Sequence, residues 1–127
     1  MRKLGFILAV ALLAACASTY RMSEAERSRS YKSTTPAAWD AAIAAVSDVG
    51  MAVIETEPEH GRIIARRHGT FWDLKGHVMF VVIRDLGSGR VRVDANAESF
   101  SEHEPVDFGL SRRIVRDYLR ALDARLL

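Results

Sequence analysis

Residues 90–100 alternate between small or apolar and polar side chains, and this pattern constrains the fold more than any other feature. One side of an extended strand would carry Val91, Val93, Ala95, Ala97 and Ser99. The other side would carry Arg90, Arg92, Asp94, Asn96 and Glu98. Successive side chains of a strand point to opposite faces, so one face is predicted to be buried and the other wet. This is typical of an antiparallel sheet.

Apolar residues recur at three- and four-residue spacing over residues 36–49, as expected for a helix with one buried stripe. The stripe consists of Trp39, Ala42, Ile43, Val46 and Val49. We expect Thr35 to be the N-cap, with Pro36 at the first helical position. Gly50 is expected to follow the helix in the left-handed conformation.

A second amphipathic helix is predicted from Phe108 to about Leu126, with Asp107 as its N-cap. Its stripe consists of Phe108, Ser111, Val115, Tyr118, Leu122 and Leu126, flanked by Ile114 and Leu119. The same pattern of apolar spacing supports it. Two such helices cover only one face of a sheet.

Four further strands are predicted from apolar and β-branched runs bounded by turns. They cover residues 28–33, 51–57, 62–67 and 77–84. The last is apolar on both faces, so it is expected at the centre of the sheet or covered on both sides. The order is β-α-β-β-β-β-α. Short connections make the sheet antiparallel, and the predicted class is an α+β two-layer sandwich with two helices on one face.

The first fifteen residues have the order of an export signal. Arg2 and Lys3 form a cationic start, and an apolar run covers residues 4–13. The run is shorter than the roughly 20 residues that a membrane-spanning helix needs. Residues 1–15 are therefore predicted to be a signal peptide.

Residues Leu13-Ala14-Ala15-Cys16 resemble the lipobox of bacterial lipoproteins. The resemblance implies that the Cys16 thiol receives a diacylglyceryl group and that the chain is cut just before it. The absence of an aspartate at residue 17 implies the periplasmic face of the outer membrane. Ordinary secretion is the alternative, because Ala15-Cys16-Ala17 also satisfies an A-x-A cleavage rule.

Cleavage before Cys16 would remove two basic residues from the 18 in the chain and leave 16, equal to the 16 acidic residues. The balanced charge gives no indication of a nucleic-acid partner. Residues 16–27 are polar and are predicted to be a lipidated tether, followed by one domain over residues 28–127. With its only cysteine lipidated, the domain would have no thiol for a disulfide or a thiolate metal site.

The arrangement of these elements resembles a group of small uncharacterised periplasmic lipoproteins from proteobacteria. The similarity consists of the lipobox, the polar tether, Trp39 in an Ala-rich helix ending Asp48-Val49-Gly50, the hairpin with Gly61, and Asp107-Phe108-Gly109 before the last helix. Their domain is similar to the helix-grip modules in a lipoprotein subunit of the outer-membrane β-barrel assembly machinery. The resemblance implies a non-enzymatic scaffold or binding module and supplies no catalytic residue.

Metal and catalytic sites are not predicted, and no cofactor is expected. The four histidines lack the spacing of metal ligands: His60, His68, His77 and His103. Glu102, His103 and Glu104 suggest acid–base chemistry, but a solvated acidic loop is the preferred interpretation because nothing nearby predicts desolvation. Residues 87–89 are predicted to be a hairpin turn rather than a phosphate-binding loop.

Two surface features are candidates for partner binding. Arg112, Arg116 and Arg120 recur every four residues on one face of the last helix, with Arg113 beside them. They suit an anionic partner such as phospholipid headgroups, lipopolysaccharide phosphates or an acidic protein, although an ordinary solvated helix face explains them too. Residues 71–72, Phe71-Trp72, are adjacent aromatics in a loop and suit either a binding anchor or a cap on the core.

These features predict a membrane-anchored, non-enzymatic binding or scaffold module of the cell envelope. Its partners would be membrane lipid, through acylated Cys16, and an envelope protein or anionic envelope component. A carrier of a lipid or cell-wall ligand is an alternative, as is a small envelope hydrolase using residues 102–104.

Overall fold

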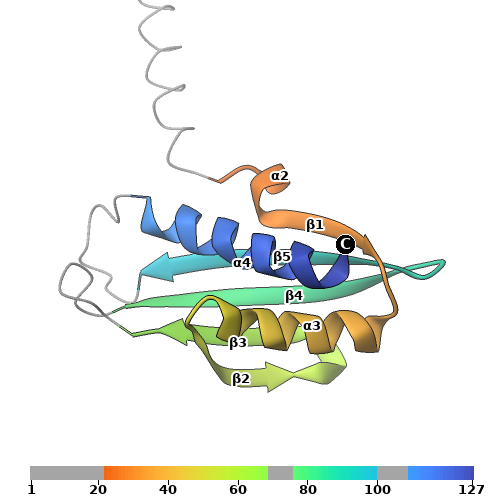
Figure 1. The fold of residues 1–127 in the computed structure, drawn as a ribbon. Coiled ribbons are helices and arrows are strands. Elements are labelled where there is room, and N and C mark those ends of the chain that lie inside the picture. The colour runs from red at the N-terminus through yellow and green to blue at the C-terminus, as the bar shows by residue number, and fades with distance from the viewer. Residues whose placement is uncertain (1–21, 69–75, 100–108) are drawn as a thin grey trace, which may run out of the picture.

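A computed structural model describes residues 22–68, 76–99 and 109–127. Five strands form one antiparallel sheet in the order β1-β5-β4-β3-β2. They are β1 (Ser28–Lys32), β2 (Ala52–Glu57), β3 (Arg62–Arg67), β4 (His77–Gly87) and β5 (Arg90–Ser99). Helices α3 (Thr35–Asp48) and α4 (Leu110–Leu126) lie side by side on one face (Figure 1). The predicted α+β sandwich is confirmed. The structure adds a short helix α2 (Glu24–Arg27) and a single 3-10 turn η1 (Pro58–His60).

Helix α3 begins one residue earlier than predicted. Its N-cap is Thr34, whose hydroxyl accepts a hydrogen bond from the Ala37 amide at 3.3 Å. The backbone ladder also starts there, because the Ala38 amide donates to the Thr34 carbonyl. The prediction of Thr35 as the N-cap was wrong, because the adjacent Thr34 caps the helix. Pro36 consequently occupies the second helical position.

The end of α3 agrees with the prediction for Gly50. This glycine has a φ of +74°, in the left-handed region. Its amide donates to the Ser47 carbonyl, and the following Met51 amide donates to the Val46 carbonyl, both at 3.0 Å. These bonds satisfy carbonyl groups that the end of the helix would otherwise leave unpaired.

Helix α4 begins later than predicted. Gly109 is its N-cap, with a φ of +75°, and the first backbone bond joins the Arg113 amide to the Gly109 carbonyl. The predicted start at Phe108 was therefore too early, because the left-handed Gly109 separates that residue from the helix. Phe108 and Asp107 themselves lie outside the described residues.

Strand β4 is longer than predicted and reaches Gly87, leaving Ser88 and Gly89 as the turn to β5. A register shift between Asp85 and Gly87 keeps the two strands paired to that point, and the Asp85 carboxylate accepts a hydrogen bond from the Gly87 amide at 2.8 Å. Its central place in the sheet is confirmed. Its second apolar face remains partly exposed, however, with Phe80 38% accessible.

The core lies between the sheet and the two helices. Helix α4 packs over β1 and β5, whereas α3 packs mainly over β4 and β2. The alternation of β5 is confirmed: Val91, Val93, Ala95 and Ala97 are buried on the helix side. Helix α3 contributes Ala38, Ala42 and Ala45, all fully buried. These small side chains let the helix backbone approach its neighbours closely.

Candidate interaction surface

Helix α2 lies at the edge of the sheet formed by β1, where it contacts both layers of the sandwich (Figure 1). It has only four residues, and Ser23 caps it by accepting a hydrogen bond from the Glu26 amide at 3.3 Å. So short a helix is unstable on its own. Its position therefore depends on its contacts with the rest of the domain.

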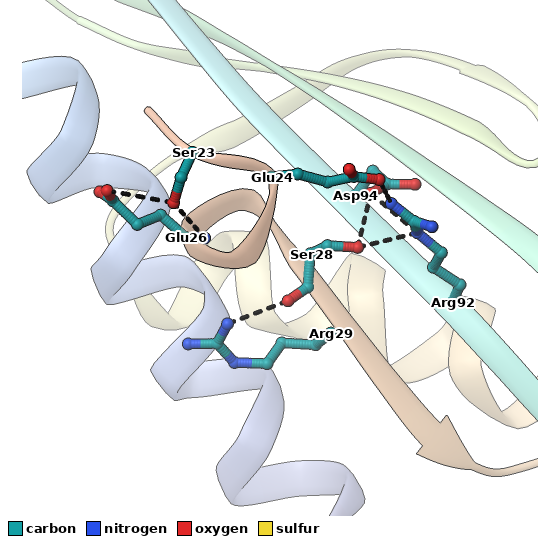
Figure 2. A network of polar contacts seen from close by, with 7 residues as sticks. All are labelled: Ser23, Glu24, Glu26, Ser28, Arg29, Arg92 and Asp94. Atoms are coloured by element: carbon teal, nitrogen blue, oxygen red, sulfur yellow. Dashed lines mark hydrogen bonds and ion pairs between the residues drawn. The ribbon is translucent and has the colours of Figure 1, made fainter. Parts of the chain in front are cut away.

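The first set of contacts joins α2 to the sheet face that points away from α3 and α4 (Figure 2). The Arg92 guanidinium donates to the Glu24 carboxylate, and its Nε donates to the Ser28 hydroxyl at 2.8 Å. Ser28 donates in turn to the Asp94 carboxylate at 2.7 Å. The hydrogen bond to Glu24, and to a smaller extent the one to Asp94, raises the pKa of Arg92 above its ordinary value. These four residues thus form a charged network across β1 and β5.

The second set of contacts joins α2 to the helix layer. The Glu26 carboxylate lies 2.9 Å from Nε of Arg112, near the start of α4. Met22, just before α2, packs partly buried against the core. With Glu24 bonded on one side of the sheet edge and Glu26 on the other, α2 straddles that edge. We call α2 and its bonds to Arg92 and Arg112 the N-terminal clamp.

Helix α2 of the clamp lies within residues 16–27, all of which were predicted to be a tether. Residues 24–27 instead form α2, which charged hydrogen bonds rather than apolar burial hold against the domain. The tether prediction remains for the part of the chain before Met22, which lies outside the described residues.

Four arginines of α4 lie on its solvent-exposed side: Arg112, Arg113, Arg116 and Arg120. At about 100° per residue they fall within an arc of about 100° around the helix axis. Arg112 pairs with Glu26, and Arg116 lies 3.6 Å from the Asp117 carboxylate. Arg113 and Arg120 form no ion pair with any residue that the structure describes. We call this set the arginine face.

A shallow pocket of about 340 Å³ lies beside the clamp. Its lining consists of Glu24, Ala25, Ser28, Arg29, Ser30 and Arg92. Of the charged groups in it, Glu24 and Arg92 are bonded to each other, and Arg29 donates to the Ala25 and Ser28 carbonyls. The arrangement therefore serves to hold α2 in place.

The sheet face opposite the helices has an apolar centre. The strand register aligns Ile64 of β3 with Phe80 of β4, and Val78 and Val82 lie on the same face of β4. All four side chains are partly accessible. This uncovered face is a second surface on which another molecule could pack.

Several predicted site residues lie outside the described residues, namely Cys16, Phe71, Trp72, Glu102, His103 and Glu104. Within the described ranges, no group of three or more His, Cys, Asp or Glu side chains is arranged to hold a metal ion. Of the histidines there, His77 is fully buried in the core, whereas His60 and His68 are exposed. No helix in the described part of the chain is long and apolar enough to cross a membrane.

The four-residue spacing of the arginines predicted the arginine face, whereas no sequence pattern predicted the clamp. Arg92 and Asp94 were assigned only to the wet face of their strand. Their partners Glu24 and Ser28 are more than 60 residues away in the sequence. The spacing of neighbouring residues cannot predict contacts between residues so far apart in the sequence.

No protein-family model matches this chain, and no curated protein is significantly similar to it.

Proposed function

We propose that this chain is a membrane-anchored lipoprotein whose domain is a non-enzymatic binding or scaffold module of the cell envelope. One observation carries the proposal. The lipobox cysteine, Cys16, is followed after only five residues by Met22, the first described residue, which packs against the core of the domain. The domain would thus be held directly beside the membrane.

The surfaces of the domain support a binding role. The helix layer carries the arginine face, and the opposite sheet face carries the apolar centre around Phe80. A scaffold that holds a partner at a membrane needs one surface toward the anchor and another left accessible. The two surfaces lie on different layers of the sandwich, so one need not block the other.

The anchor is tested on the full chain expressed in a Gram-negative host. The intact mass of the mature protein should equal that of residues 16–127 plus acyl groups, and the protein should fractionate with outer membranes. The Cys16→Ser variant should lose both properties. An unmodified mature mass, or a wild-type protein free in the periplasm, would refute the proposed anchor.

The binding role is tested by crosslinking in cells. A photo-crosslinking amino acid at Phe80, on the uncovered sheet face, should give a discrete adduct with an envelope component. The same group at Glu59, in η1 at the far end of β2, is the matched control and should give less of that adduct. Equal or absent adducts at both positions would contradict a binding role for the uncovered face.

A further inference from the structure

We infer that the arginine face docks on the anionic phospholipid headgroups of the membrane that carries the anchor. The inference rests on the proposed function, because it takes Cys16 as the lipidated residue. It adds an orientation: the exposed side of α4, near the β1 edge of the sheet, faces the bilayer, and the domain does not tumble freely at the end of a tether.

Chain length limits how far the arginine face can lie from the membrane. From Cys16 to Met22 there are six Cα–Cα steps, which span at most about 20 Å when fully extended. Met22 packs against the core directly before α2. The clamp then holds α2 against Arg112, the first arginine of the face. Met22, the first described residue, is therefore close to the arginine face.

The charges of this surface complement an anionic bilayer. Arg113 and Arg120 are exposed and form no ion pair with another described residue, so their full charge is available to a ligand. The acidic groups near the arginine face are Glu26, Asp117 and Asp123, and each lies beside an arginine partner. Phosphate groups are preferred ligands of arginine because they accept its hydrogen bonds in pairs.

Position strengthens this attraction. A basic residue is attracted by an anionic leaflet only within about a Debye length of its surface, about 8 Å at physiological salt. The short chain between Cys16 and Met22 allows the arginine face to reach that range, and because the domain is tethered, docking does not depend on the protein concentration. Each arginine in the range raises the ratio of docked to undocked domain about fivefold.

Docking in this way would leave the far edge of the sheet away from the membrane. Strand β1, with the clamp, forms one edge of the sheet, and β2 forms the opposite edge (Figure 1). Ile54 of β2 is 55% accessible. The β2 edge would therefore be presented to the periplasm, where a partner can reach it.

The test uses the full lipidated chain in vesicles of phosphatidylcholine, with or without about one third phosphatidylglycerol. Because Cys16 is the only native cysteine and carries the lipid, a second cysteine can be labelled selectively. One fluorophore is placed at Ala124→Cys, exposed on α4 near Arg120, and another at Glu59→Cys, in η1. Energy transfer to an acceptor lipid reports the distance of each from the bilayer.

We expect more transfer from residue 124 than from residue 59, and an increase at residue 124 when phosphatidylglycerol is present. The increase should vanish at 1 M salt, where the Debye length is about 3 Å. The Arg113→Gln/Arg120→Gln double variant should lower the docked-to-undocked ratio by more than tenfold. Arg84→Gln/Arg90→Gln removes the same charge from exposed sites of the β4–β5 hairpin and should leave docking unchanged.

Docking is overturned if transfer from residue 124 is equal in the two vesicles, or if Arg113→Gln/Arg120→Gln leaves it unaltered. If Arg113→Gln/Arg120→Gln abolished a crosslink to an envelope protein in cells but changed nothing on vesicles, the arginine face would bind an acidic protein instead. That result would also overturn docking on phospholipid. Anchorage is scored separately by flotation with neutral vesicles. A chain that floats without charge-dependent transfer refutes docking alone, whereas a chain that fails to float refutes the proposed anchor as well.

Discussion

The hydroxyl of Tyr118 in α4 donates a 3.0 Å hydrogen bond to the carbonyl of Ala42 in α3, and both residues are fully buried. The bond joins the two helices inside the core. Replacing Tyr118 with Phe keeps the ring and removes the donor. We expect the free energy of unfolding to fall by about 1 kcal/mol. Urea unfolding monitored by circular dichroism measures it, and an unchanged midpoint would show that the bond contributes nothing.

Alkaline pH should destabilise the domain. Burial raises the pKa of Tyr118 and of Tyr31, and at Tyr31 a 2.6 Å hydrogen bond to Asp123 raises it further. Both phenols therefore stay neutral in the folded state, whereas in the unfolded chain they ionise above about pH 10. Their contribution is complete below that pH and is lost progressively as the pH rises from there toward the raised pKa of the folded state. Unfolding midpoints between about pH 8 and 11 should fall more steeply for wild type than for Tyr31→Phe/Tyr118→Phe.

Gly61 should tolerate a side chain less well than Gly50. Both have positive φ, +65° and +74°. A Cβ on Gly50 would meet nothing within 4 Å, whereas a Cβ on Gly61 would overlap the backbone carbonyl of Ile83. The Ile83 amide also donates to the Gly61 carbonyl at 2.8 Å. We expect Gly50→Ala to cost about 1 kcal/mol and Gly61→Ala about 3 kcal/mol. Equal losses in denaturant titrations would contradict this explanation.

Acid should weaken the link between the C-terminal ends of α3 and α4. Arg125 donates two hydrogen bonds, at 2.6 and 2.9 Å, to the Asp48 carboxylate, and these bonds lower the pKa of Asp48. The link stabilises the fold above the ordinary pKa of aspartate, about 4, and is lost as the pH falls through the lowered value. Asp48→Asn should reduce Tm at pH near 7 and make progressively less difference below about pH 4. Asp40→Asn, exposed on the same helix, should show no such trend.

The clamp can be opened without unfolding the domain. Glu24→Gln removes the charge that faces Arg92, and Glu26→Gln removes the one that faces Arg112. In each variant we expect faster amide hydrogen exchange at α2, with little change in global Tm, because exposed ion pairs contribute little to overall stability. The double variant should exchange fastest, and Glu59→Gln is the control. Unaltered exchange at α2 would show that other contacts hold it.

Local periodicity was sufficient to predict the layers. The alternation around Val91 and Val93, together with the apolar stripes of the two helices, indicated a sheet with one covered face. For the helices and strands that were predicted, the errors lay at their ends, such as Thr34 rather than Thr35 at the start of α3. Adjacent residues of equal capping ability leave such a boundary undetermined until the backbone bonds are known.

The clamp could not be predicted in the same way. Four residues do not form an apolar stripe, and the partners of Glu24 and Glu26 come from β5 and α4. The apolar second face of β4 left two alternatives open for a related reason. Val78, Phe80 and Val82 were compatible with a central strand or with a cover on both sides; the strand is central, and both α3 and α4 lie on the other face. An apolar run specifies that a face avoids water, but it does not identify what covers it.

The position of the clamp also decides how a mechanical load would enter this domain. Tension on the chain before Met22, if it acted across β1 alone, would peel that strand from β5 one hydrogen bond at a time. Because α2 is bonded to Arg92 in the sheet and to Arg112 in α4, the load is divided between the two layers before it reaches the first bond of β1. Helix α2 thus reduces the force that reaches the β1–β5 hydrogen bonds.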